Sequence, residues 1–139
     1  MAQEILAYPT KPEAIKEELR YLANYLGAHN HKTCEVLFGF AWGIEYYPDK
    51  DWTYLEFQIE KLVEEVEQVE TLGRDRLGDH DLFIRLPKTG LEFLFCHHCD
   101  IHLTFEERNE IADFFNQRWD SLGFNPEERL KPDNTTPNP

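Results

Sequence analysis

Apolar residues recur every three or four positions in two segments of the chain, the spacing that gives a helix one buried face. The first segment begins at Thr10 and ends at Gly27, and the second begins at Thr104 and ends at Gly123. Each threonine is followed three positions later by a glutamate, the pattern of a capping box, and each glycine is a typical helix stop. The two segments therefore predict amphipathic helices. Their apolar positions are Ile15, Leu19, Leu22 and Leu26 in the first, and Ile111, Phe114, Phe115, Trp119 and Leu122 in the second.

Alternation with a period of two predicts strands elsewhere in the chain. From Cys34 to Tyr47 bulky residues alternate with mostly small ones, which indicates one strand or a hairpin bent at a glycine. Residues 81–86 and the run from Leu91 onward flank the turn sequence 87–90, so they predict an antiparallel hairpin.

Residues 52–72 fit two patterns. A four-three rhythm of apolar residues runs through the whole segment and predicts one long helix, with Asp51 as its cap and Gly73 as its stop. A shorter alternation at its start fits a strand that is followed by a helix from about Glu60. We favour the long helix. The rhythm consists of Leu55, Ile59, Leu62, Val66 and Val69, and the alternation of Leu55, Phe57 and Ile59.

Helices and antiparallel strands in this order predict an α+β fold, in which a small antiparallel sheet has the helices packed on one face. At 139 residues the chain is too short for two domains of ordinary size, so we expect a single domain over residues 1–130. Residues 131–139 contain no residue that would join a core, and they predict a disordered tail.

The composition predicts residence in the cytoplasm. No stretch approaches the roughly 18 consecutive apolar residues of a membrane span, and the first residues lack the basic and apolar regions of a secretory signal. The three cysteines are too few for a disulfide framework and odd in number, which fits reduced thiols.

Acidic residues outnumber basic ones by 27 to 14, which gives a formal net charge of −13. This charge would repel nucleic acid and anionic membranes, because their binding needs Lys and Arg, and it would attract a basic protein partner. The candidate contacts are two aspartates of a turn, a tryptophan and a row of glutamates. They are Asp49, Asp51, Trp52, Glu56, Glu60, Glu64 and Glu67. Solubility alone, or mimicry of nucleic acid, would also account for the acidity.

Two cysteines, three histidines and an aspartate lie within residues 96–102. If this stretch continues the preceding strand, Cys96 and His98 share a face about 7 Å apart, within reach of one zinc ion. His102 joins them only if the chain bends after Cys99. A second group of ligand-type residues is available in His29, His31 and Cys34. The alternative is a structural corner, in which Cys96 is a buried apolar side chain and the histidines bond backbone groups.

Catalytic patterns are weak. Asp100 or Asp81 could orient His98, and Cys96 or Cys99 could act as a nucleophile. No nucleophile elbow, oxyanion loop or phosphate-binding glycine run accompanies them in the sequence. We therefore expect a non-enzymatic protein without an organic cofactor.

Two blocks of the sequence resemble a pattern in small bacterial proteins. Residues 77–84 contain Gly-x-x-Asp-Leu in front of a strand, and residues 93–103 contain a strand that ends in Cys-His-x-x-Asp-Ile-His. The family is the single-domain immunity proteins that neutralise polymorphic toxins. The resemblance implies direct binding of a toxin, and a basic nuclease toxin would suit the negative charge of this chain. It also implies that His98, Asp100 and His102 fix a corner between a strand and a helix.

Overall fold

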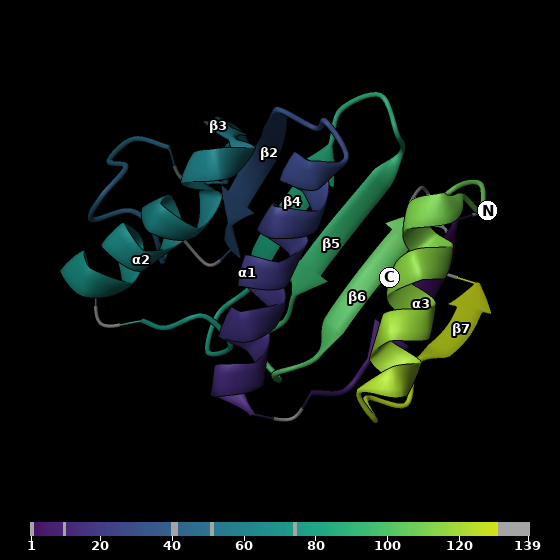
Figure 1. The fold of residues 1–139 in the computed structure, drawn as a ribbon. Helices are drawn as coiled ribbons and strands as arrows, with labels where there is room; N and C mark the ends of the chain where they lie inside the picture. The colour runs from purple at the N-terminus through teal and green to yellow at the C-terminus, as the bar shows by residue number, and fades with distance from the viewer. Residues whose placement is uncertain (1, 10, 40–41, 51, 74, 131–139) are drawn as a thin grey trace, which may run out of the picture.

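Seven short strands form one antiparallel sheet in the computed structural model, which describes residues 2–9, 11–39, 42–50, 52–73 and 75–130. They are β1 (Gln3–Ala7), β2 (Thr33–Phe38), β3 (Leu55–Gln58), β4 (Leu82–Leu86), β5 (Leu91–Phe95), β6 (Ile101–Phe105) and β7 (Glu127–Leu130). Their order across the sheet is β3-β2-β4-β5-β6-β1-β7 (Figure 1). Strand β1 therefore lies between the last two strands of the described chain.

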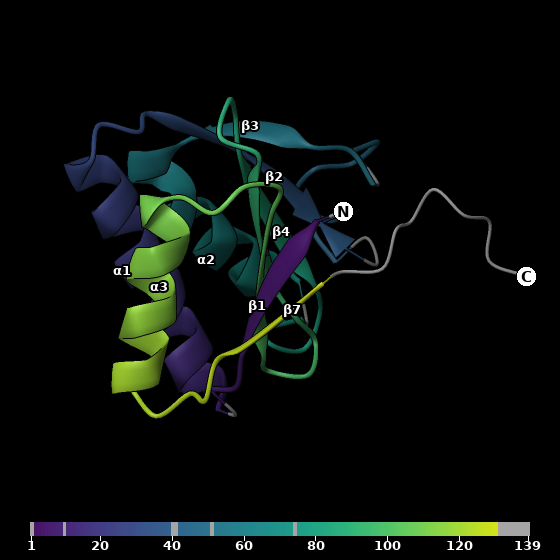
Figure 2. The same ribbon diagram turned by 90° about the vertical axis from the view of Figure 1, so that its right-hand side faces the viewer.

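Three α-helices of the described chain cover one face of this sheet (Figure 2). They are α1 (Pro12–Ala28), α2 (Leu62–Leu72), which follows the short 3-10 helix η2 (Ile59–Lys61), and α3 (Glu110–Ser121). The predicted α+β fold, an antiparallel sheet with helices on one face, is confirmed. None of the helices in the described ranges has the length and apolarity that a membrane crossing requires. The tail predicted for residues 131–139 lies outside the described residues.

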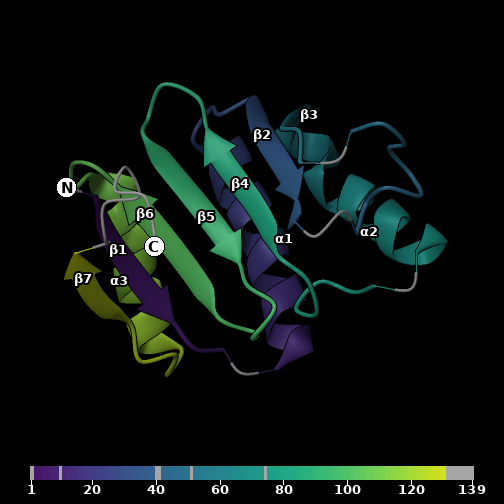
Figure 3. The same ribbon diagram turned by 180° about the vertical axis from the view of Figure 1, so that it is seen from behind.

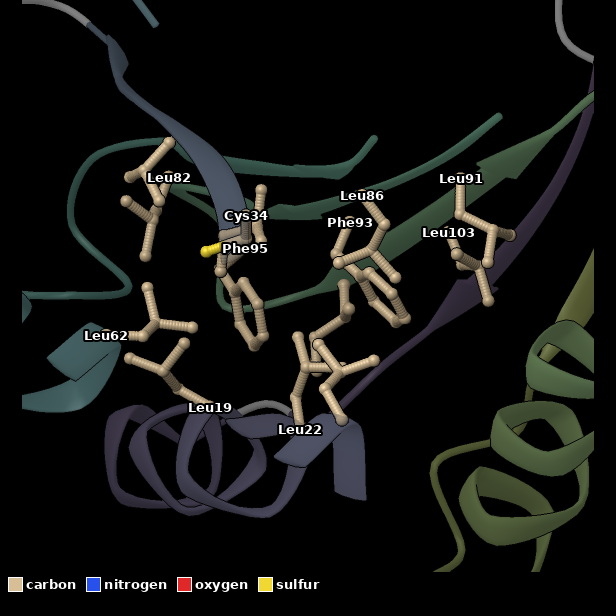
Figure 4. Close-up of a cluster of buried hydrophobic side chains, with 14 of the residues drawn as sticks. Leu19, Leu22, Cys34, Leu62, Leu82, Leu86, Leu91, Phe93, Phe95 and Leu103 are labelled. Atoms are coloured by element: carbon tan, nitrogen blue, oxygen red, sulfur yellow. The ribbon is translucent and has the colours of Figure 1, made fainter. Parts of the chain in front are cut away.

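The core lies between the helices and the inner face of the sheet (Figure 4). Alternate residues of β5 point into it, and antiparallel pairing sets Phe93 directly beside Ile84 and Leu103. Leu19 and Leu22 of α1 close this apolar row from the helical layer. Burial of each such leucine or phenylalanine side chain contributes about 1.5–3 kcal/mol to stability.

The outer face of the sheet carries no helix in the part of the chain that the structure describes (Figure 3). One row across it is charged: Glu35, Arg85 and Glu92 are neighbours in the register of β2, β4 and β5. Arg85 Nε donates to Glu35 over 2.8 Å, and the guanidinium carbon lies 3.6 Å from the centre of the Tyr54 ring. The next row is apolar across β2, β4 and β5 and then reaches His102 in β6.

The long helix predicted over residues 52–72 is wrong. Strand β3 occupies its first part and pairs with β2, so that Phe57 lies opposite Cys34 in the core. The backbone of Gln58 is extended, with ψ of 137°, and this interrupts any helix that would run through it. The four-three rhythm describes a helix only in α2, where Leu62, Val66 and Val69 are buried.

The strand or hairpin predicted from Cys34 to Tyr47 is also wrong in its second part. Strand β2 ends at Phe38, and residues 42–49 form turns. Trp42 is buried within these turns, and its Nε1 donates to the carbonyl of Asp81 over 2.8 Å. Bulky residues here fill the core from a loop, so their alternation does not reflect a strand.

The start of α3 differs from the prediction, whereas its end agrees. Thr104 belongs to β6, and the helix is capped instead by Asn109, whose side-chain oxygen accepts from the backbone N–H of Ala112 over 3.0 Å. Gly123 has a φ of +78°, the left-handed conformation that commonly ends a helix.

Helix α1 begins close to the predicted position. Lys11 occupies the cap and Pro12 the first turn, where the missing N–H of proline costs nothing. The predicted cap Thr10 lies outside the described residues. The helix continues through Gly27 to Ala28, and the chain then turns at Asn30, with φ of +68°.

Candidate functional site

A tight turn between β5 and β6 builds the candidate site. Phe95 and Ile101 form the last strand pair, and beyond them the N–H of Cys96 donates to the carbonyl of Asp100 over 2.8 Å. Cys99 closes the turn with a bond from its N–H to the carbonyl of Cys96 (3.0 Å) and a φ of +60°. The chain therefore bends at Cys99, which is the condition under which the sequence allowed His102 to join Cys96. The corner from strand to helix is wrong, because β6 follows the turn and completes a hairpin.

This hairpin gathers three side chains on the outer face of the sheet. The sulfur of Cys96, a carboxylate oxygen of Asp100 and a ring nitrogen of His102 all lie within 4.8 Å of one another. Asp100 Oδ1 and His102 Nε2 are only 3.3 Å apart. This distance suits an ion pair, yet both atoms are buried and neither makes a hydrogen bond with the described residues.

Two strands that the sequence did not predict hold His102 in place. Its Nδ1 lies 3.1 Å from Oε2 of Glu4 in β1, and Oε1 of Glu4 accepts from Arg129 Nε of β7 over 2.8 Å. Glu4 is buried, with 4% of its surface exposed. Burial alone would raise the pKa of Glu4, but the hydrogen bonds from Arg129 and His102 outweigh it and hold the pKa below its usual value.

Cys96 is a buried thiol at neutral pH. Burial, reinforced by the Asp100 carboxylate, raises the pKa of Cys96 to about 12. Burial also raises the pKa of Cys99, whose Sγ lies 3.6 Å from the carbonyl oxygen of Gly78. Both cysteines are free of disulfides. Thiolates are the nucleophiles and the metal ligands, so Cys96 becomes reactive only when something displaces its proton.

A second group of ligand-type residues shares Cys96 and is already satisfied. Asp81 Oδ1 accepts from the backbone N–H of His97 over 2.9 Å and lies 2.7 Å from His97 Nδ1. This aspartate therefore fixes the turn. His98, which the sequence placed beside Cys96, is exposed, and its ring centre lies 4.0 Å from that of His97.

The structure thus brings together two of the three predicted metal ligands, Cys96 and His102, and supplies Asp100 where His98 was expected. The second cluster predicted from His29, His31 and Cys34 does not join them. Cys34 lies in the core on the opposite face of the sheet, and His29 Nδ1 contacts the carbonyl of Tyr25 at the end of α1 over 2.8 Å.

The predicted partner-binding residues lie around β3, η2 and α2. Glu60, Glu64 and Glu67 are exposed at helical spacing, and Glu56 is exposed on the edge strand β3. Asp49 is exposed in the turn before them, Trp52 has 56% of its surface exposed, and Asp51 lies outside the described residues. The tyrosines beside them pack inward: Tyr47 contacts Phe38 and Phe57, and its hydroxyl donates to Glu65.

No protein-family model, curated protein or solved structure matches this chain. The resemblance to immunity proteins therefore stays a prediction.

Proposed function

We propose that this protein is a non-enzymatic binding protein that neutralises a basic protein partner, as an immunity protein neutralises a toxin, by direct contact. The observation that supports it most is a row of exposed glutamates along η2 and α2, namely Glu60, Glu64 and Glu67, which we call the glutamate surface. Glu56 is exposed on the preceding strand β3. A residence in the cytoplasm belongs to the same proposal.

The glutamate surface is only weakly neutralised from within the chain. Glu64 lies 3.5 Å from Lys61, and Glu67 lies 3.6 Å from Arg20 of α1; in both pairs about half of each side chain is exposed. Such exposed pairs contribute at most about 1 kcal/mol, so they exchange readily for contacts with a partner. With a net charge of −13, the chain would also accelerate the approach of a basic protein.

Trp52 supplies an exposed apolar anchor three residues before β3. It is 56% exposed, whereas Trp42 and Trp119 are 3% and 1% exposed. Tryptophan is enriched among the residues that dominate binding energy at protein interfaces. An aromatic anchor with acidic neighbours suits a partner with an apolar pocket surrounded by Lys and Arg.

The test is co-expression with the product of the adjacent gene, followed by a binding measurement on the purified pair. We expect protection of the host cell and a complex that the triple variant Glu60→Lys, Glu64→Lys, Glu67→Lys weakens by about 100-fold, since like charges brought together cost several kcal/mol. Trp52→Ala should weaken it by at least about 10-fold.

The matched control is Glu13→Lys, Glu17→Lys, Asp120→Lys. It changes the net charge by the same amount at exposed positions of α1 and α3. An equal loss of binding in both triple variants would show that net charge acts without a defined surface. Absence of both a complex and protection would contradict the proposal.

A further inference from the structure

Asp100 and His102 place two buried polar atoms close together, and no hydrogen-bond donor of the described residues serves either of them. A carboxylate oxygen only accepts hydrogen bonds, and an imidazole that donates from Nδ1 to Glu4 presents a lone pair at Nε2. Asp100 Oδ1 and His102 Nε2 thus face each other as two acceptors 3.3 Å apart, without a hydrogen bond to the described residues. Burying unsatisfied acceptors is costly, and a cation between them would remove that cost.

We propose that Cys96, Asp100 and His102 bind one zinc-type divalent metal ion on the outer face of the sheet. Their sulfur, oxygen and nitrogen atoms are the donors that zinc takes in proteins. This inference is independent of the proposed partner binding, because the glutamate surface lies on other elements.

The spacing of the donor atoms agrees with such an ion. Two ligands about 2.1 Å from a tetrahedral ion lie about 3.4 Å apart, close to the 3.3 Å between Asp100 Oδ1 and His102 Nε2. The Cys96 sulfur is within 4.8 Å of a carboxylate oxygen of Asp100 and a ring nitrogen of His102, so a shift of about an ångström, or one change of rotamer, completes three ligands. Asp100 and His102 keep 17% and 16% of their side chains exposed, so the cluster lies just beneath the surface of the sheet.

Glu4 is the positioning residue of this site. Ligating histidines usually donate their second ring N–H to a carboxylate, which fixes the ring and its tautomer. Glu4 makes this contact with His102 Nδ1 over 3.1 Å and is itself held by Arg129 over 2.8 Å. The satisfied group of Asp81, Cys96 and His97 lacks such an arrangement, because Asp81 already binds the backbone of the turn.

The alternative to a metal ion at this position is a second proton on the His102 ring. A doubly protonated His102 would donate from Nε2 to Asp100, but neither atom has a hydrogen-bond partner among the described residues. A titration with Co²⁺ distinguishes a metal ion that binds all three ligands from a His102 imidazolium that pairs with the carboxylates of Glu4 and Asp100.

The test is titration of the untagged, chelator-treated full chain with Co²⁺ alone, followed by displacement with Zn²⁺. We expect one equivalent of Co²⁺ to give a thiolate-to-cobalt charge-transfer band and strong visible bands of a tetrahedral site, both abolished by Zn²⁺. Cys96→Ser should remove the charge-transfer band. His102→Gln should lower the Co²⁺ affinity by at least about 10-fold, and Glu4→Gln should lower it by about 10-fold while the band persists.

His98→Ala and Cys99→Ser are the matched controls, because both residues lie in the same turn but outside the three-residue cluster. Each should keep the band and the affinity of the parent chain. A parent chain that gives no charge-transfer band overturns the proposal without any variant. A band that persists in Cys96→Ser, or an affinity that falls as far in His98→Ala as in His102→Gln, overturns it as well.

Discussion

Glu18 joins two helices through a fully bonded buried carboxylate. It lies on α1 with 3% of its surface exposed, and it accepts from Arg118 Nη2 over 2.6 Å and from Trp119 Nε1 over 2.8 Å on α3. Arg118 in turn lies over the ring of Tyr21, 3.3 Å from its centre. A buried charge of this kind is tolerated because each of its neighbours supplies a donor or a cation.

Glu18→Ala should lower the free energy of unfolding by about 3 kcal/mol, because it strands the Trp119 N–H and the Arg118 guanidinium. The measurement is the urea midpoint at constant m-value. Glu17→Ala, at an exposed position one residue earlier, is the control and should change stability by less than about 0.5 kcal/mol. A change equally small in Glu18→Ala would show that the pair makes no net contribution.

At the same scale, the candidate site shows what a sequence pattern can and cannot supply. Cys96 and His102 come together because the chain turns between them, which the alternation of a continuous strand does not describe. Alternation placed His98 beside Cys96, and that failed because His98 lies in the turn itself. The contribution of Glu4 had no local signal, since it comes from a strand 98 residues away in the sequence.

At the scale of elements, the pairing of β6 decides that α3 does not begin at the capping box predicted from Thr104. Thr104 and the glutamate three positions on have the residues of a capping box, but β6 pairs with β5 and β1 as far as residues 104 and 105 and keeps Thr104 extended. Strand pairing therefore outweighs the local cap. The segment 52–72 failed for the same reason, since its apolar rhythm also fits a strand that pairs with β2.

Asn109→Ala should destabilise the protein by about 1 kcal/mol, because the N–H of Ala112 loses its acceptor in the first turn of α3. Asn109→Asp keeps a capping oxygen and adds a negative charge at the helix N-terminus, so its stability should equal or exceed that of the parent chain. Thermal unfolding of the three proteins checks this. Equal losses in both variants would mean that the side-chain cap does not act in this way.

At the scale of the whole molecule, electrostatic repulsion among the excess acidic residues lowers the stability of the folded state. The chain has 27 acidic and 14 basic residues, and several ion pairs of the described residues are exposed and therefore weak. The fold class could be predicted because helical and strand periods are local. The sheet order could not, because β7 is exposed along its whole length and joins the sheet by pairing with β1 from the other end of the described chain.

Added salt should raise stability, because it screens this repulsion more than it weakens exposed ion pairs. We expect the urea midpoint to rise between about 0.01 M and about 0.1 M sodium chloride, as the screening length falls from about 30 Å to about 10 Å. The triple control variant of α1 and α3, which removes acidic charge, should show a smaller rise. A midpoint that falls with salt would show that attractive pairs dominate.

The position of β1 has a consequence for how the chain is made. This strand is synthesised before the other six strands of the described chain, yet its neighbours β6 and β7 are the last two of them. Until β6 and β7 emerge, Ile5 and the other residues of β1 have no partner strand, so this apolar segment stays unpaired in the nascent chain. Pairings that span so much sequence fold slowly, so the sheet closes only after most of the domain has been synthesised.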